Sequence, residues 1–223
     1  MNNRIKNLRN RHQGERCYLV CNGPSLTKMD LGQLRKEMVI GLNKIFLGIK
    51  KFGFYPRYYV AVNPKVIEQS HAQIQQLNCV KFLSQAGRKY LKEDGLTYFL
   101  QTDGQGRFSK DLTQTVHEGW TVTHVALQVA YYLGFQEVII IGMDHRYQFQ
   151  GQPNEARVLN GPDPNHFSSD YFGHGQQWDN PDLQNAESAY REARRAFETD
   201  GRKIYDATLD GACTIFEKRA NPF

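Results

Sequence analysis

The chain has 223 residues, of which 40% are hydrophobic, and a formal net charge of +5. The hydrophobic content and the lack of low-complexity tracts exclude a disordered protein, and the longest apolar run, Val138 to Ile141, is too short to span a bilayer. The first residues have no apolar signal segment, so we expect a cytoplasmic protein, and their basic excess would permit peripheral association at the inner membrane face.

The basic excess is concentrated near the start of the chain, in Arg4, Lys6, Arg9, Arg11 and Arg16. We expect a solvated, partly frayed lead-in segment rather than a nucleic-acid site, because no DNA- or RNA-binding motif accompanies these residues. The four cysteines lie in apolar or strand-like stretches, which predicts buried free thiols.

Short apolar runs alternate along the chain with helical patterns. The predicted strands cover residues 17–20, 38–43, 58–63, 79–83, 97–100, 137–141 and 203–206, with 214–216 as a strand-like terminal extension. The predicted helices cover 44–51, 64–76, 121–133 and 180–200, and a further helix can begin at 30–35. This alternation predicts one Rossmann-like α/β domain over 1–223, with a mostly parallel sheet and flanking helices.

Residues 145–179 differ from the rest of the chain, because they are rich in Gly, Pro, Asn, His and aromatic residues and show little periodicity. A long segment of this kind inside a compact domain usually has a functional role. We therefore predict a lid-like insertion, followed by a helix whose cap and first turn are Asn180 and Pro181.

The first strand ends in the turn Asn22-Gly23-Pro24-Ser25. Gly23 would let the backbone approach a ligand closely, and Ser25 could cap the next helical segment. The carboxyl end of the first strand is where open α/β sheets bind nucleotides. An ordinary β-turn remains the alternative for this stretch taken alone.

Asparagines end the first three predicted strands at Asn22, Asn43 and Asn63. In a parallel sheet these ends share one edge, where the amides could bind a base, a ribose or a phosphate. Capping of the following helices is the alternative, above all for Asn63, which precedes a proline.

The strand at 137–141 ends in Gly142-Met143-Asp144-His145-Arg146-Tyr147 at the same edge. Asp144 could hold a metal or a ribose, or simply form an Asx turn, and Arg146 and Tyr147 could face a diphosphate. No P-loop and no serine nucleophile elbow is present.

Two histidines of the lid segment are candidates for chemistry or anchoring. His174 lies between two glycines and is the candidate general base, whereas His166 beside Phe167 would anchor the lid. His145, His166 and His174 lack the spacing of zinc sites, so no resident metal is expected. Asp144 with Asp163 or Asp170 could still support Mg²⁺ through a substrate phosphate.

The motifs Asn22-Gly23-Pro24-Ser25-Leu26, Asn63-Pro64 and Ile141-Gly142-Met143-Asp144 resemble those of the bacterial lipooligosaccharide sialyltransferases. They equally resemble the wider family of 6-hydroxymethylpterin diphosphokinase-like proteins, which includes flagellin glycosyltransferases. The resemblance runs from about Cys17 to Phe216.

This resemblance implies that Asn22, Asn43 and Asn63 bind the donor and that Thr121 or Thr123 touches the nucleotide. It implies that Tyr147 stabilises the departing phosphate. His174, in the stretch Tyr171-Phe172-Gly173-His174, would deprotonate the acceptor hydroxyl without a metal.

We therefore predict a transferase, with glycosyl transfer from a nucleotide sugar to a surface glycan or glycolipid precursor favoured and no cofactor required. One alternative is Mg²⁺-dependent diphosphoryl transfer from ATP to 6-hydroxymethylpterin. Another is a non-catalytic nucleotide-binding protein. No nucleic-acid partner is expected, and whether the protein is an oligomer stays open.

Overall fold

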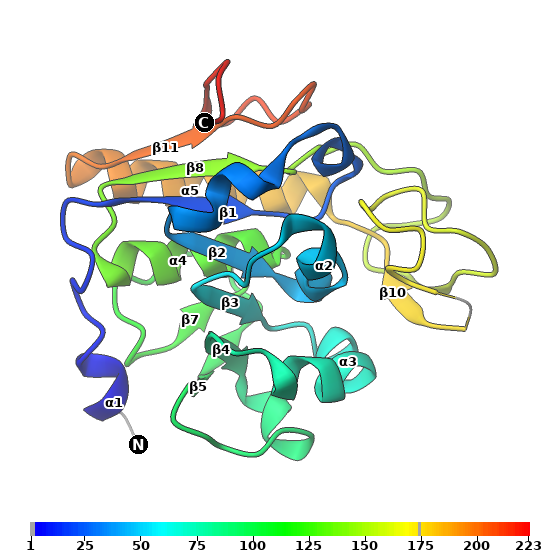
Figure 1. Ribbon diagram of the computed structural model, residues 1–223, viewed down its shortest axis with the longest axis horizontal. Coiled ribbons are helices and arrows are strands. Elements are labelled where there is room, and N and C mark those ends of the chain that lie inside the picture. The colour runs from blue at the N-terminus through cyan, green and yellow to red at the C-terminus, as the bar shows by residue number, and fades with distance from the viewer. Residues whose placement is uncertain (1–2, 174) are drawn as a thin grey trace.

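The computed structural model describes residues 3–173 and 175–223. Eight of the described strands form one sheet in the order β12-β11-β8-β1-β2-β3-β4-β5, and every pairing in it is parallel (Figure 1). The strands of this sheet are β1 (Arg16–Val20), β2 (Val39–Leu42), β3 (Tyr58–Ala61), β4 (Val80–Ser84), β5 (Thr97–Leu100), β8 (Glu137–Ile141), β11 (Lys203–Asp206) and β12 (Glu217–Lys218). The predicted α/β fold with a parallel sheet is confirmed.

The central strands are buried on both faces, so consecutive side chains enter two different cores. Cys17 and Leu19 of β1 pack with the long helices α4 (Val122–Leu133) and α5 (Leu183–Thr199), while Tyr18 and Val20 pack with α3 (Pro64–Gln76) and the short helical turns. The helical elements are α1 (Asn3–Lys6), η1 (Pro24–Lys28), η2 (Leu31–Lys36), η3 (Asn43–Gly48), α2 (Ile49–Phe52), α3 (Pro64–Gln76), η4 (Gln85–Lys89), α4 (Val122–Leu133) and α5 (Leu183–Thr199). A parallel strand covered on both sides reads as a continuous apolar run, which is what made β8 recognisable in the sequence.

The helix ends follow local capping chemistry. The Asn63 side chain accepts from the backbone N–H groups of Lys65 and Val66 at the start of α3, and Pro64 occupies its first turn. Thr121 caps α4, and Gly134, with φ 95°, ends it in the left-handed conformation. The predicted start of the last long helix was wrong, because Asp182 rather than Asn180 caps α5.

The order of the strands reverses at β1. The chain adds β2 to β5 on one side of β1 and then crosses to place β8, β11 and β12 on the other side. The carboxyl ends of β1 and β8 are neighbours at this switch point, and open α/β sheets form their ligand crevice outside such a point.

The lid segment, residues 145–179, lies beyond the carboxyl ends of the strands, where Figure 1 labels β10. It contains the antiparallel pair β9 (Ala156–Val158) and β10 (Gln177–Asp179). Tyr171, Phe172 and Trp178 form a small core with Val66 of α3. The Lys65 Nζ lies 2.5 Å from Asp179 Oδ1, so the segment is also fixed to α3 by an ion pair.

The start of the chain is not a frayed lead-in, and this expectation was wrong for the described residues. Ile5 and Leu8 are buried in the main core, and the backbone N–H groups of Asn10 and His12 donate to the carbonyls of Tyr132 and Leu133 at the end of α4. Packing of these apolar side chains against α4 fixes a segment that looks polar by composition.

Four further details differ from the prediction. The stretch at 30–35 forms a 3₁₀ turn rather than an α-helix, and most of 44–51 is also 3₁₀. The short parallel pair β6 (Thr102–Asp103) and β7 (Val116–His117) was not predicted. The last strand lies at Glu217–Lys218 rather than at 214–216. The four cysteines are buried and free, as expected, and among the described helices none is both long and apolar enough to cross a membrane.

Candidate functional site

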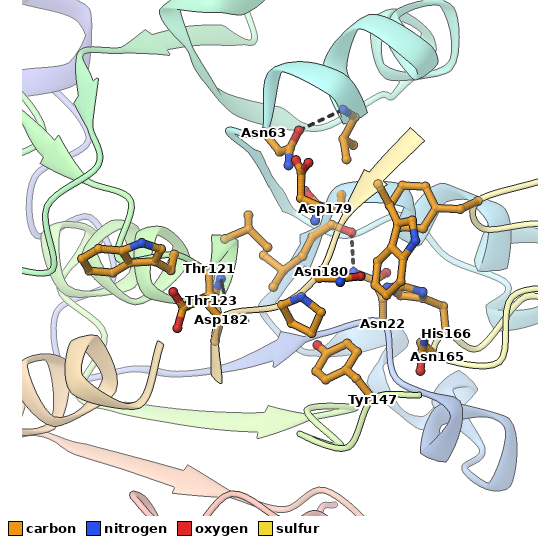
Figure 2. Close-up of a pocket in the computed structure, with 18 of the residues that line it drawn as sticks. Asn22, Asn63, Thr121, Thr123, Tyr147, Asn165, His166, Asp179, Asn180 and Asp182 are labelled. Carbon is orange, nitrogen blue, oxygen red and sulfur yellow. Dashed lines mark hydrogen bonds between the residues drawn. The ribbon is translucent and has the colours of Figure 1, made fainter. Parts of the chain in front are cut away.

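A cavity of about 480 Å³ opens at the carboxyl ends of the strands (Figure 2). Its walls are the residues after β1, β2, β3 and β8, the start of α4 and the lid segment. Most residues that the sequence singled out line it, namely Asn22, Gly23, Asn43, Asn63, Thr121, Thr123, Asp144, Arg146, Tyr147, His166 and Tyr171. Pro24 and Ser25 do not line it, and His174 lies outside the described residues.

Ser25 joins the end of β1 to the end of β8. Its backbone N–H donates to Asp144 Oδ1 at 3.0 Å, and its hydroxyl donates to Asp144 Oδ2 at 2.7 Å. Gly23 lies against the same carboxyl group, and a Cβ at this position would come within 2.6 Å of both Asp144 Cγ and the Gly142 carbonyl oxygen. The expectation that Ser25 caps a helix was wrong, since its side chain instead holds Asp144. Gly23 is required by close approach of the protein's own carboxylate.

Two asparagines at strand ends carry buried oxygens that have no hydrogen-bond partner in the described part of the chain. Asn22 donates from Nδ2 to the Leu42 carbonyl at 3.1 Å, and its Oδ1 has no hydrogen bond. The Leu42 carbonyl can only accept, so it fixes which end of the Asn22 amide carries oxygen. Asn43 has a positive φ of 45° and also leaves its Oδ1 unpaired. Asn63 differs from both, because its oxygen is the cap of α3.

Asn180, directly after β10, repeats the arrangement of Asn22. Its Nδ2 donates to the carbonyls of Gln150 and Gln152 at 2.7 and 2.9 Å, and its buried Oδ1 has no partner among the described residues. The sequence did not reveal this role, because Asn-Pro before an apolar pattern is typical of a helix start. Buried acceptors without partners in a native protein call for a physical reason, such as a bound ligand or water.

The lid segment places a histidine and a carboxylate together at the cavity. His166 Nδ1 lies 2.8 Å from Oδ2 of Asp163, whose side chain is fully buried, and the His166 ring stacks on Tyr171 with centroids 3.8 Å apart. A carboxylate only accepts, so in the neutral ring Nδ1 carries the proton and Nε2 is the free acceptor. The stacking on Tyr171 is the kind of contact that an anchoring role would use.

Lys44, which follows β2, binds the lid segment, and the sequence analysis did not predict this role. Its Nζ donates to the Tyr171 carbonyl at 2.6 Å and to the side chain of Gln176, and it lies 4.7 Å from the centre of the Phe172 ring. Burial lowers the Lys44 pKa to about 8, while nearby Asp163 opposes this shift. No sequence signal indicated this lysine, because its partners lie about 130 positions further along the chain.

Arg146 and Tyr147 lie next to each other on the cavity wall. Tyr147 is 38% exposed, yet the surrounding protein raises its pKa to about 12, with Cys21, Asp144 and Asp163 adding to the shift. Its hydroxyl is therefore protonated near neutral pH and can donate a hydrogen bond. Arg146 is exposed, and its guanidinium has no hydrogen-bond or ion-pair partner among the described residues.

The start of α4 contributes Thr121 and Thr123 to the cavity. The Thr121 hydroxyl oxygen accepts from the Thr123 N–H at 3.3 Å and lies 3.3 Å from the Tyr190 hydroxyl. The Thr123 hydroxyl lies 3.6 Å from the buried Cys21 thiol. Both threonines are thus fixed by the protein at the N-terminus of α4.

Backbone strain gathers around the cavity. Four non-glycine residues with positive φ line it, Asn43 at 45°, Trp120 at 58°, His145 at 54° and Asn154 at 64°. Asn and His tolerate this region comparatively well, but a bulky residue such as Trp rarely adopts it. Such strain clusters at functional sites and needs surrounding structure to maintain it.

Three carboxylates of the cavity are engaged by protein donors. Asp144 is held by Ser25 and Asp179 by Lys65, and Asp182 accepts from Asn185 and Asn154. Within 3–173 and 175–223 no group of three or more His, Cys, Asp or Glu is arranged to hold a metal. The donor set therefore does not fit a Mg²⁺ site as it stands.

The chain is a Rossmann-like α/β protein with a cavity at the switch point of its parallel sheet. Residues 1–150 match the family described as 6-hydroxymethylpterin diphosphokinase MptE-like, and the chain belongs to this family. No curated protein matches the chain.

A solved structure titled as the MAf glycosyltransferase from Magnetospirillum magneticum AMB-1 resembles this fold, with a TM-score of 0.59 at 14% identity. The likeness covers 97% of this chain and 37% of that one, so the present chain spans well under half of the glycosyltransferase's length. Both names are those of group-transferring enzymes, which agrees with the class that the sequence predicted.

Proposed function

We propose that this protein is a glycosyltransferase that takes a sugar from a nucleotide donor and passes it to a glycan or glycolipid acceptor. The observation that carries the proposal is the cavity at the switch point, where Asn22, Asn43 and Thr121 surround a space of about 480 Å³. Volumes of this order accommodate cofactor-sized ligands. The family membership and the fold likeness to a glycosyltransferase support the same class.

In this proposal the donor phosphate lies near Arg146 and Tyr147. Of the lysine and arginine side chains that line the cavity, Lys65 is paired with Asp179, whereas Arg146 has no carboxylate partner among the described residues. The Tyr147 hydroxyl stays protonated and donates to the phosphate as negative charge develops on it. Arg146→Ala should weaken nucleotide binding, and Tyr147→Phe should lower turnover more than binding.

The base that takes the acceptor proton is proposed to be a lid histidine. The family resemblance favours His174, and the described geometry offers His166, with its Nε2 free and its ring oriented by Asp163. The variants His174→Ala and His166→Asn separate the two. Full transfer activity in His174→Ala would refute the role proposed for that residue, and a loss in His166→Asn that appears in kcat rather than donor affinity would assign the base to His166.

Diphosphoryl transfer from ATP to a pterin alcohol is the second candidate, favoured by the description of the family that matches residues 1–150. It would need a divalent cation on the phosphates, and the engaged carboxylates of the cavity argue against it. If ATP binds only with Mg²⁺ and Asp144→Asn abolishes that binding, this candidate gains over the glycosyltransferase.

Thermal-shift measurements with cytidine, uridine, guanosine and adenosine nucleotides, each with and without Mg²⁺, test both candidates. A ligand that binds the native state raises the melting temperature by mass action. Stabilisation by one nucleotide without metal, followed by turnover of its sugar conjugate, is the expected result. Binding without any turnover would favour a non-catalytic protein, and no stabilisation by any nucleotide would refute both enzymes.

A further inference from the structure

Trp120 is the most unusual residue of the cavity wall. It is 44% exposed although it is among the largest apolar side chains, and its φ of 58° lies in the left-handed region. A bulky residue at this conformation is a true outlier, because its Cβ crowds the following carbonyl. The proposed donor site does not use Trp120, so the strain has no explanation in that site.

The surrounding structure forces this conformation on the backbone. The preceding Gly119 also has a positive φ of 56°, and a Cβ there would approach His124 and Ala189 at 2.6 and 2.7 Å. The Gly119 N–H donates to the Gln105 carbonyl at 3.0 Å. The two left-handed residues therefore turn the chain sharply between β7 and α4, directly over the packed side chains of α4 and α5.

The indole of Trp120 packs against Gly106, where the absence of a side chain makes room for the ring. A Cβ at Gly106 would lie 3.1 Å from Trp120 Cζ3, so a side chain at that position would press on the indole. Trp120 also lines the cavity. The ring therefore rests on the segment around Gly106 while it keeps a large exposed surface.

The charges near Trp120 select against phosphate. Glu118 and Asp182 line the cavity, and the Glu118 carbonyl accepts from the N–H of Thr121, directly after Trp120. Figure 2 shows Thr121, Thr123 and Asp182 well separated from Asn165 and His166. Acidic side chains repel a diphosphate and accept hydrogen bonds from neutral hydroxyl groups. An apolar ring face beside carboxylate acceptors matches a sugar, which has an apolar face and hydroxyls around its edge.

We propose that Trp120 is the stacking platform of an acceptor subsite, where it binds the apolar face of a neutral pyranose ring while Glu118 accepts a hydrogen bond from a ring hydroxyl. This inference rests on the proposed glycosyltransferase function and names the chemical class of its acceptor. This role would account for the positive φ of Trp120, because the turn keeps the indole on the cavity wall instead of burying it in the core.

Tryptophan fluorescence gives a direct test. The chain has two tryptophans, so the Trp178→Phe variant leaves Trp120 as the reporter. Acrylamide quenching is measured alone, with the methyl glycosides of galactose, glucose, mannose and N-acetylglucosamine, and with CMP, UDP, GDP and ADP. Protection of Trp120 by at least one glycoside and by none of the nucleotides is expected. Protection by a nucleotide alone, or by no compound, would overturn the proposal.

Variants give a second readout once a turnover assay exists. Trp120→Ala should raise the KM for the acceptor about ten-fold, and Trp120→Phe should raise it less, while nucleotide affinity stays within about two-fold. Tyr55→Ala is the matched control, because Tyr55 is 53% exposed and does not line the cavity. An unchanged acceptor KM in Trp120→Ala would overturn the proposal.

The two proposals fail in different ways. If nucleotides stabilise the protein but no glycoside protects Trp120, the acceptor subsite is refuted and the donor site stands. If no nucleotide stabilises the protein, the glycosyltransferase itself is refuted, whatever Trp120 binds.

Discussion

His124 should make the protein lose stability in mild acid. The side chain is fully buried on α4, its Nε2 donates to the Arg107 carbonyl at 2.8 Å, and its Nδ1 has no partner within 3–173 and 175–223. Burial, with a smaller contribution from nearby His117, lowers the pKa of His124 from 6.5 to about 4. The residue also packs under Gly119, so its protonation would disturb the wall that presents Trp120.

The sign of the effect comes from proton binding. Between pH 6.5 and 4 the unfolded chain binds a proton at this residue that the folded chain does not. The contribution of neutral His124 to stability is therefore fully present above pH 6.5 and is lost as the pH falls toward 4. With these two pKa values the loss between pH 7 and pH 5 is about 2 kcal/mol. That is a large part of the roughly 5–15 kcal/mol that stabilises a typical domain.

Urea unfolding at pH 7, 6 and 5 measures this loss. His124→Gln removes the titrating group and keeps a neutral donor for the Arg107 carbonyl, so the decline between pH 7 and pH 5 should become smaller by about 2 kcal/mol. His71→Gln is the matched control, since His71 is exposed on α3, and it should leave the decline unchanged. Equal declines in the wild type and in His124→Gln would refute the reasoning.

Three further results are expected. Ser25→Ala should lower the free energy of unfolding by about 2 kcal/mol in urea titrations, because a charge-assisted bond to Asp144 is lost; a change below about 0.5 kcal/mol would contradict this. Trp120→Gly should cost less than about 1 kcal/mol, since it relieves a positive φ, whereas Trp178→Gly in the lid core should cost at least about 3 kcal/mol. Lys65→Ala should change global stability by less than about 1 kcal/mol but speed proteolytic cleavage within 145–179, because it removes the ion pair to Asp179. Unchanged cleavage would show that this pair does not fix the lid segment.

The elements that the sequence predicted well are those whose signals are local. The limits of α3 were predicted as observed, because Asn63 and Pro64 define its start by capping and by ring geometry. β8 was recognisable because a strand buried on both faces is apolar throughout. The pair β6 and β7 was missed, since strands of two residues have too few positions to show a period.

Part of the candidate site was also predicted from local sequence signals. Asn22, Asn43 and Asn63 come directly after strands, and parallel strands bring their carboxyl ends to one edge. What the sequence could not show was how each asparagine is used, and Asn63 is a helix cap whereas Asn22 keeps a free oxygen. The contacts of Asn180 and Lys44 were missed because their partners are distant in the chain, and no local pattern indicated the positive φ of Trp120.

The sequence by itself determined the fold class, the order of the main strands and helices and the sheet edge that carries the site, because hydrophobic periodicity and capping act over a few residues. Only the tertiary structure decided which polar groups remain free in the cavity. Ser25 and Asp144 are 119 positions apart, and only the folded chain shows that these two candidate ligand-binding residues contact each other. Burial likewise changes the pKa values of Lys44 and His124, and no local pattern encodes it.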